Sequence, residues 1–377
     1  MSGSTKDAPS WLDRLHDRWA RLLADPAFQR AAAAFPLTRP IAVRRSRRLF
    51  DLSAGFVYTQ TLLACCELDL FSRLLEGPAD ADALAAGSGI AVERLRRLLD
   101  AAVALKLLRR RADGLYGLGR HGAPLAGNPG LRAMLAHNRL LYEDLRRPIP
   151  LLQGADGTDL ARYWPYAGRA DPTTLNAEDV AAYSGLMAAS QEFVAAEVLD
   201  LYPFGRHREV LDVGGGEGAF LAAVRARHPG LRLALFDLPA VAERARSRLA
   251  CPDASCPEVR IAGGDFLTDA LPTGADLVTL VRIVHDHDDD AVLTLFRAVR
   301  AALAPGGRLL VAEPMSGVSG ASTVGPAYFS WYLLAMGTGR PRTPAELARL
   351  LRAAGFGQVG RARTRNPVLA SVLTASL

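Results

Sequence analysis

A run of glycines between an apolar segment and a predicted helix restricts this chain to few folds. The run reads Val210-Leu211-Asp212-Val213-Gly214-Gly215-Gly216-Glu217-Gly218-Ala219-Phe220. Glycine lets backbone N–H groups lie close to a ligand, and the N-terminus of the following helix adds a partial positive charge. Asp237 ends the next apolar segment, about 20 residues after the glycines, where an acid accepts hydrogen bonds from ribose hydroxyls. The sequence therefore predicts an α/β sheet with a pocket for a nucleoside cofactor.

Two nucleoside cofactors compete for this pocket. The spacing Gly214-x-Gly216-x-x-Ala219 is compatible with the dinucleotide fingerprint of NAD enzymes. S-adenosylmethionine is the alternative, because methyltransferases place an acid before the glycines and another after the third strand, beside the adenine. Asp212 and Asp265, the latter in Gly264-Asp265-Phe266, stand at these two places. An acid at the end of each of three successive strands favours S-adenosylmethionine. A sheet without a cofactor is the other alternative, but consecutive glycines would weaken a turn that has no ligand to approach.

The segments around the glycine turn predict three regions. They are an N-terminal helical, basic arm over residues 1–48, a helical and winged-helix dimerisation domain over 49–175, and a cofactor-binding domain over 176–377. Helices are expected at 8–35, 49–76 and 177–201. The expected strands of the last region are 209–213, 231–236, 259–262, 276–283, 308–312, 357–363 and 367–375, with one of the final pair antiparallel.

Residues 80–121 have the pattern of a winged helix-turn-helix. A short helix at 82–86, a turn and a helix at 92–105 precede a hairpin around Asp113-Gly114. Arginines on the second helix would suit DNA phosphates, so a DNA-binding regulator that senses a nucleoside cofactor is one alternative. Helix-turn-helix modules also serve as dimer scaffolds, and a complete cofactor domain follows this one.

Composition limits the remaining classes of protein. With 377 residues, 50% of them hydrophobic and 22% charged, the chain suits a folded soluble protein of about two domains. No apolar run approaches the roughly 20 residues that span a bilayer, and residues 1–7 lack a secretory core. Cys65 and Cys66 lie in an apolar helix, while Cys251 and Cys256 lie in a loop without further ligands. We therefore expect a cytoplasmic protein without a metal site.

The predicted fourth strand ends in a run of histidines and acids, His285-Asp286-His287-Asp288-Asp289-Asp290. Reactive groups of open α/β sheets lie at such carboxyl ends. A metal site would need ligands from other segments, and Asp288–Asp290 are typical of a helix N-terminus. His285 is suited to act as a general base that takes a proton from a hydroxyl as methyl transfer begins.

With these motifs the chain resembles the two-domain S-adenosylmethionine-dependent O-methyltransferases that include the plant caffeate and animal hydroxyindole enzymes. The resemblance covers about residues 50–377 and includes Phe236-Asp237-Leu238-Pro239, Gly264-Asp265-Phe266, Arg282-Ile283-Val284-His285-Asp286, Pro305-Gly306-Gly307, Glu313-Pro314 and Ala354-Gly355-Phe356. It implies a seven-stranded, mostly parallel class I methyltransferase sheet. It also implies a homodimer.

The resemblance assigns roles within the site. The implied catalytic residues are His285 as base, Glu313, which orients it, and Asp286. Asp237 would bind the ribose, Asp265 and Phe266 the adenine, and Arg282 the methionyl carboxylate. The implied cofactor-binding set is Asp212, Gly214, Gly216, Asp237, Leu238, Gly264, Asp265, Phe266 and Arg282.

Two departures from the family pattern bear on the acceptor. The family usually has His-Asp-Trp where this chain has His285-Asp286-His287, and Pro341 stands where the plant enzymes have a second glutamate beside the base. The carboxylate pair that clamps a phenol ring is therefore incomplete, which argues against a phenolic acceptor.

The N-terminal segments narrow the resemblance. Residues 33–39 and 49–60 resemble the demethylspheroidene (hydroxyneurosporene) O-methyltransferases of purple phototrophic bacteria, which methylate the terminal hydroxyl of an acyclic carotenoid in the spheroidene and spirilloxanthin pathway. An O-methyltransferase of a polyketide or aromatic natural product is the alternative. Arginines interleaved with apolar residues at 39–50 favour contact with an anionic membrane, where such a substrate dissolves. A solvated helix face is the plainer interpretation of the same residues.

Overall fold

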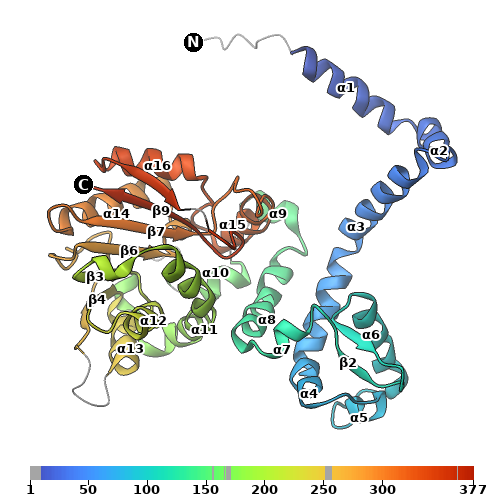
Figure 1. Cartoon of the computed structure of the whole chain (residues 1–377), viewed down its shortest axis with the longest axis horizontal. Coiled ribbons are helices and arrows are strands. Elements are labelled where there is room, and N and C mark those ends of the chain that lie inside the picture. Colours follow the sequence, from blue (N-terminus) through green and yellow to red (C-terminus); the bar gives the residue numbers. More distant parts are fainter. Residues whose placement is uncertain (1–9, 155–156, 165, 167–170, 251–256, 363) are drawn as a thin grey trace. The chain divides into compact units, whose positions relative to one another are not determined.

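The computed structural model describes residues 10–154, 157–164, 166, 171–250, 257–362 and 364–377. The chain divides into two compact units, Met1–Ala126 and Gly127–Leu377 (Figure 1). Cys251 and Cys256 lie outside the described residues.

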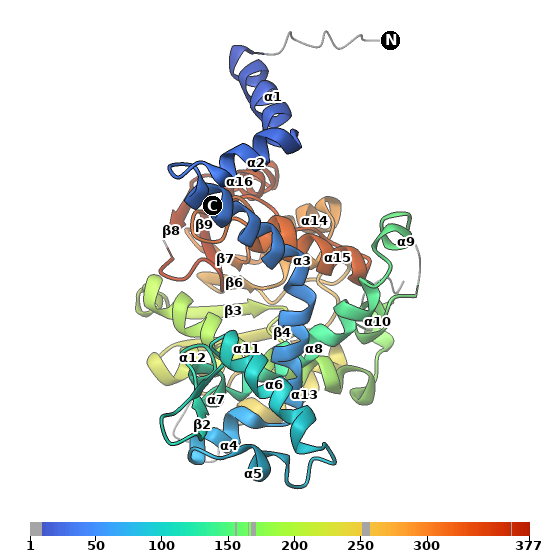
Figure 2. The ribbon, with the colours of Figure 1, turned by 90° about the vertical axis from the view of Figure 1, so that its right-hand side faces the viewer.

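Three helices begin the first unit. They are α1 (Trp11–Ala24), α2 (Pro26–Ala34) and α3 (Arg39–Glu67). Ser10 and Asp13 form a capping box at the start of α1, and the Asp25 side chain caps α2. Figure 2 shows α3 as one continuous helix. It crosses the predicted limit of the arm at residue 48, because no proline follows Pro40 before Pro78.

Within the described residues, α3 is the one helix long and apolar enough, by length and composition, to cross a membrane. This corrects the expectation that no apolar run approaches that length. Polar uncharged side chains interrupt the apolar residues between 49 and 66, but Asp51 is the only charged residue there. The mean hydropathy of this stretch therefore stays high. Thr61, Leu63 and Cys65 are buried at the end of α3, which packs against α4 and α6. That end of α3 therefore belongs to the core of the first unit.

The rest of the first unit is the predicted winged helix. Leu108 of the first hairpin strand pairs with Leu118 of the second in antiparallel register. The core consists of apolar residues from several elements, among them Leu70, Phe71, Leu84, Leu95 and Leu99. The elements are α4 (Leu70–Glu76), α5 (Ala81–Ala85), α6 (Val92–Ala104), β1 (Leu108–Arg110), β2 (Tyr116–Leu118) and α7 (Ala123–Ala126).

The second unit begins with α8 (Pro129–Asp144), α9 (Pro148–Leu152), α10 (Asp159–Tyr163) and α11 (Ala177–Leu201). We expected residues 127–175 to belong to the dimerisation domain. In the structure the helices of this range belong to the second unit, where α8 lies against α11 and α10 lies against both α8 and α15 (Ser330–Met336). The helix predicted at 177–201 has those bounds.

A seven-stranded sheet forms the centre of the second unit, with the order β5-β4-β3-β6-β7-β9-β8. β9 is antiparallel to β7 and β8, and the pairs among β3 to β7 are parallel, so the predicted mostly parallel sheet is confirmed. The strands are β3 (Glu209–Val213), β4 (Arg232–Asp237), β5 (Arg260–Gly263), β6 (Leu277–Val281), β7 (Arg308–Glu313), β8 (Val359–Ala362) and β9 (Ser371–Ser376).

Helices cover both faces of this sheet (Figure 1). One core cluster joins the sheet to α14 (Asp289–Ala302) and α16 (Pro344–Ala353), and the other joins it to α11, α12 (Ala219–Arg227) and α13 (Pro239–Leu249). β3 has β4 on one side and β6 on the other, so the strand order reverses at β3. Ligands of open α/β sheets bind at the carboxyl ends of the strands beside such a reversal.

Candidate active site

A cavity of about 480 Å³ lies at the carboxyl ends of β3, β4 and β6, as the strand order predicts. The predicted site residues that line it are Asp212, Gly214, Gly216, Asp237, Leu238, Asp265, Phe266, Arg282 and Asp286. Gly264, His285 and Glu313 are not among its lining residues. Gly264 packs beneath the site, because a Cβ there would lie 2.8 Å from the ring of Phe236.

The glycine turn brings the backbone to the cavity. Gly214 and Gly216 have positive φ angles of 70° and 60°, which side-chain-bearing residues seldom adopt. A Cβ on Gly214 would lie 2.5 Å from the Ile283 side chain, so the close approach of these segments requires glycine. The Gly216 N–H donates to Asp237 Oδ2 at 2.7 Å, which ties the turn to the end of β4.

Asp212 and Asp237 are two buried carboxyls in this cavity. Asp212 Oδ1 accepts from the Thr279 hydroxyl at 2.6 Å, while its Oδ2 has no hydrogen-bond partner among the described groups. Burial raises the pKa of Asp212 to about 7. Burial also raises the pKa of Asp237 to about 6, against the opposing effect of the N–H groups of Gly216 and Leu238.

The unpartnered oxygen of Asp212 distinguishes between S-adenosylmethionine and a dinucleotide as the cofactor. A buried carboxylate oxygen without a donor calls for a ligand that brings positive charge or an N–H group. S-adenosylmethionine has an ammonium and a sulfonium, whereas the pyrophosphate of a dinucleotide would bring negative charge toward Asp212. The residues present therefore fit S-adenosylmethionine.

The segment after β5 forms another wall of the cavity. Asp265 Oδ1 accepts from the Leu267 N–H at 2.8 Å, so its carboxylate is held in a tight turn. The ring of Phe266 stands perpendicular to His287, with 5.2 Å between the centroids. His287, which replaces the tryptophan of the family pattern, also lines the cavity, and burial lowers its pKa.

Arg282 follows β6 with a φ of 62°, an unusual conformation for a residue with a Cβ. Its guanidinium donates to Ser190 Oγ at 2.8 Å and to Met187 Sδ at 3.0 Å, both on α11. The predicted carboxylate-binding arginine therefore lines the cavity while its guanidinium is tied to α11.

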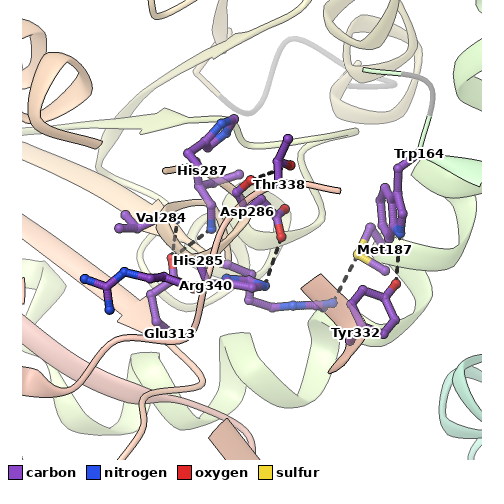
Figure 3. Close-up of polar contacts among 12 residues, drawn as sticks. Trp164, Met187, Val284, His285, Asp286, His287, Glu313, Tyr332, Thr338 and Arg340 are labelled. Atoms are coloured by element: carbon purple, nitrogen blue, oxygen red, sulfur yellow. Dashed lines mark hydrogen bonds and ion pairs between the residues drawn. The ribbon is translucent and has the colours of Figure 1, made fainter. Parts of the chain in front are cut away.

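His285 lies between two carboxylates (Figure 3). Its Nδ1 contacts Glu313 Oε2, and its Nε2 lies 3.2 Å from Asp286 Oδ1. Glu313, at the end of β7, is itself fixed, because its Oε1 accepts from the N–H groups of Ile283 and Val284 at 2.8 and 2.6 Å. Burial by itself would lower the pKa of His285, but Asp286 and Glu313 outweigh it and raise that pKa.

The loop before α16 fixes the turn that bears His285. Arg342, 2% exposed, donates to the carbonyls of Val284 and His287 at 2.9 and 2.6 Å. Thr338 donates to the Asp286 carbonyl at 2.9 Å. A Cβ on Gly339 would collide with the carbonyl of His285. Sequence reasoning considered residues 339–343 only for their missing glutamate and overlooked this structural role.

Aromatic residues that the sequence analysis did not select complete the cavity. Trp164, Tyr166 and Tyr183 line it together with Met187 of α11. Tyr332 holds Trp164 in place, because its hydroxyl accepts from the indole N–H at 2.9 Å (Figure 3). The sequence signal for Trp164 and Tyr166 is an aromatic cluster in a Pro/Gly/Asp-rich segment, whereas Tyr183 lies on α11 and Tyr332 on α15.

Within the described part of the chain, no three His, Cys, Asp or Glu side chains are grouped as metal ligands would be. The His/Asp run is divided instead between two roles. His285 and Asp286 belong to the site, and Asp289 at the start of α14 binds Arg342, with 2.8 Å between Oδ1 and Nε.

Two family profiles match the chain. One is described as an O-methyltransferase domain and matches residues 164–357. The other is described as an O-methyltransferase dimerisation domain and matches residues 50–125. Together they cover the winged helix and most of the sheet.

Relatives match over most of their length. Demethylspheroidene O-methyltransferase of Cereibacter sphaeroides is 44% identical, over 94% of this chain and 93% of the relative. The enzyme of the same name from Rhodobacter capsulatus is 40% identical, over 96% of this chain and 86% of the relative. Among solved structures, human N-acetylserotonin methyltransferase in complex with S-adenosylmethionine has a TM-score of 0.72 at 25% identity, covering 88% of this chain and 97% of that one.

Proposed function

We propose that this chain, which belongs to the S-adenosylmethionine-dependent O-methyltransferase family, methylates the terminal hydroxyl of an acyclic carotenoid. The observation that carries the acceptor is the 44% identity, over nearly the whole chain, to an enzyme named for demethylspheroidene. The family resemblance expected from the sequence is confirmed by the two profiles and these relatives. Nothing in the comparisons supports the DNA-binding alternative.

Different residues of the cavity are assigned to different parts of the cofactor. S-adenosylmethionine, when bound, supplies a methyl group on a positively charged sulfur. We assign Asp237 to the ribose hydroxyls, Asp265 and Phe266 to the adenine, and the free oxygen of Asp212 to the ammonium. Gly214 and Gly216 leave room for the backbone to lie against the ligand. We assign Arg282 to the methionyl carboxylate of the cofactor. To bind it, the guanidinium would either keep its contacts with α11 and donate its remaining N–H groups, or give those contacts up.

A methyl transfer to a neutral hydroxyl also releases a proton. The group formed by His285, Asp286 and Glu313 reaches the cavity through Asp286, which lines it. We assign proton removal to this group. Alignment of the hydroxyl with the methyl group contributes further to the rate.

The walls of the cavity favour an apolar acceptor. Trp164, Tyr183 and Met187 present aromatic and thioether surface. The second carboxylate that would clamp a phenol is replaced by Pro341. A long polyene would place its hydroxyl end in the cavity and leave the rest of its length outside, because 480 Å³ also has to hold the cofactor.

The acceptor's insolubility gives residues 39–50 a role. The side chains of Ile41, Val43, Leu49 and Phe50 are 54–70% exposed, and arginines lie between them. We propose that the enzyme is a cytoplasmic homodimer that meets its substrate at an anionic membrane through this segment. The dimerisation profile supports the homodimer.

The decisive test uses labelled S-adenosylmethionine with separate carotenoid and phenolic acceptors. Label should pass to a carotenoid with a terminal hydroxyl, and the Asp237→Ala variant should need more cofactor for the same rate. Transfer to phenols or polyketides alone would refute the carotenoid assignment and support an aromatic natural-product enzyme. Heat-treated protein serves as the blank and should transfer no label.

A further inference from the structure

A buried hydrogen-bond network of three side chains ends at the aromatic wall of the cavity. The indole N–H of Trp164 donates to the Tyr332 hydroxyl at 2.9 Å (Figure 3). The same hydroxyl lies 2.8 Å from His137 Nε2. His137 belongs to α8, Trp164 follows α10 and Tyr332 belongs to α15, and all three are buried. Trp164 lines the cavity, whereas His137 and Tyr332 are not among its lining residues. The network therefore connects a cavity residue to two side chains outside the cavity.

The chemistry of the three groups fixes the direction of both hydrogen bonds. An indole N–H can only donate, so the Tyr332 oxygen accepts from Trp164. The indole has no acceptor for the phenol proton, so this proton points to His137 Nε2. Burial raises the pKa of Tyr332 and lowers the pKa of His137 to about 4, so near neutral pH the phenol is protonated and the imidazole is uncharged. His137 must therefore carry its own proton on Nδ1.

The Trp164 ring also contacts the aromatic residues beside the catalytic group. The centroids of Tyr166 and Tyr183 lie 5.7 and 5.4 Å from that of Trp164. The Tyr166 hydroxyl donates to Asp286 Oδ2 at 3.1 Å, next to His285. The hydroxyl to be methylated has to lie at this catalytic group. The apolar part of the acceptor next to that hydroxyl therefore lies against these aromatic rings.

We propose, on the basis of the methyl transfer proposed above, that His137 and Tyr332 are positioning residues that hold the Trp164 ring as the wall against which the apolar part of the acceptor packs. Without Tyr332 as acceptor, the indole N–H would be a buried donor without a partner, which is costly, and the ring would turn to relieve this cost. A turned ring changes the shape of the cavity beside the acceptor hydroxyl. The network thus controls acceptor affinity, whereas the strand ends control cofactor affinity.

The protonation of His137 can be measured without an acceptor. Protein labelled with ¹⁵N in its seven histidines gives ring signals, and the signals lost in His137→Gln belong to this residue. At pH 7 we expect a neutral ring with its proton on Nδ1, because Nε2 accepts from Tyr332. A ring with its proton on Nε2, or a charged ring, would overturn the network. Because no methylation is measured, this result is independent of which compound is the acceptor.

The position of the Trp164 ring is the second readout. Protein with 5-fluorotryptophan gives fluorine signals for its four tryptophans, and Trp164→Phe identifies the one of interest. Tyr332→Phe removes the hydroxyl to which the indole donates, so this signal should move. Tyr328→Phe is the matched control, because its hydroxyl donates to Asn138 of α8 at 2.7 Å, next to the network but outside it. A signal that moves equally in both variants, or in neither, would show that Tyr332 does not position the ring.

Kinetics with an acceptor that the wild type methylates connects the ring to function. Tyr332→Phe should raise the acceptor KM about tenfold, with turnover and S-adenosylhomocysteine affinity changed about twofold or less, because the lost contact acts on the ground state and the transition state alike. His137→Leu should act in the same way. His137→Gln keeps an acceptor oxygen for the Tyr332 hydroxyl, so it should restore most of the acceptor affinity.

The outcomes separate acceptor positioning from a merely structural role and from the acceptor assignment. A loss of S-adenosylhomocysteine affinity as large as the change in KM would make the network structural only. An unchanged KM with a displaced fluorine signal would refute the role of Trp164 in acceptor binding. A wild type that methylates phenols but no carotenoid would refute the carotenoid assignment, while the comparison of KM values with a phenol would still test the network.

Discussion

Single residues at strand ends were the most predictable part of the site. Asp212, Asp237 and Asp265 lie at or just after the carboxyl ends of apolar strands, and the sheet brings such ends together. Arg342 and Tyr166 could not be found in this way, because their contacts join segments 58 and 120 residues apart. The sequence likewise does not show that Asp286 lines the cavity whereas His285 does not.

Cofactor affinity should depend on the ionisation of Asp212. Its folded-state pKa of about 7 lies above the ordinary value of 3.8, so the carboxyl is neutral below about pH 7 and charged above it. A ligand ammonium binds the charged form, so S-adenosylhomocysteine should bind more weakly as the pH falls through this range. Calorimetry across the range measures this dependence.

Adenosine, which lacks the ammonium, is the control ligand for this experiment, and Asp212→Asn is the control variant. The pH dependence should be much smaller with either one. An equal dependence for adenosine would assign the titration to another carboxyl of the cavity, with Asp237 the first candidate because its pKa is about 6.

Asp237→Ala should weaken S-adenosylhomocysteine binding by about 1–3 kcal/mol, the cost of a lost charge-assisted hydrogen bond. Asp237 also holds the Gly216 and Leu238 N–H groups, so part of the loss is local loosening of the turn. Asp237→Asn keeps one acceptor oxygen and should lose less. Calorimetry of both variants gives the two values, and an unchanged affinity in Asp237→Ala would remove Asp237 from the cofactor site.

At the scale of elements, periodicity predicted types better than limits. The strands and the winged helix lie where alternating and helical patterns placed them, within a few residues. α3 was divided too early, because a change from basic to apolar composition does not end a helix. The placement of α8 and α10 in the second unit depends on their packing against α11 and α15, which no local pattern records.

The loop before α16 should control the stability of the catalytic turn. Arg342→Ala leaves the buried carbonyls of Val284 and His287 without their donor, and we expect the free energy of unfolding to fall by about 1–3 kcal/mol. Arg342→Lys should recover little of it, because an ammonium lacks the planar fork. Denaturant titration measures the change. Arg349→Ala, at an exposed position of α16, should change stability little, and equal losses in the two would contradict this account.

At the scale of the whole molecule, the fold class and the order of its two domains were predictable because each domain has its own sequence signature. The arrangement of copies was not, although the exposed apolar face of α3 indicates a partner. Leu52 and Phe56 are 81% and 59% exposed and lie four residues apart, on one face of the helix. Such a face is characteristic of an interface.

Light scattering should therefore give about twice the 40.3 kDa chain mass. Leu52→Glu with Phe56→Glu should return the protein to a monomer, because the substitution buries charge in the interface. Ile149→Glu, at a residue 60% exposed in the second unit, is the control and should leave the dimer intact. A wild-type monomer, or a double variant that stays dimeric, would place the interface elsewhere.

Membrane contact should depend on the arginines of residues 39–50. Each arginine near an anionic surface contributes about 1 kcal/mol, weakened by salt, while Leu49 and Phe50 enter the interface. Wild-type protein should float with anionic but not neutral vesicles. Arg44/Arg45/Arg47/Arg48→Glu should abolish this binding, whereas Arg94/Arg97/Arg109/Arg120→Glu, with the same charge change at exposed positions of the winged helix, should not.

Arg45 also lies 6.0 Å from the Trp19 ring, so circular dichroism must first show that the helices are intact. If both quadruple variants lose binding equally, net charge alone attracts the protein; if neither floats less than the wild type, the arginines of α3 serve the fold.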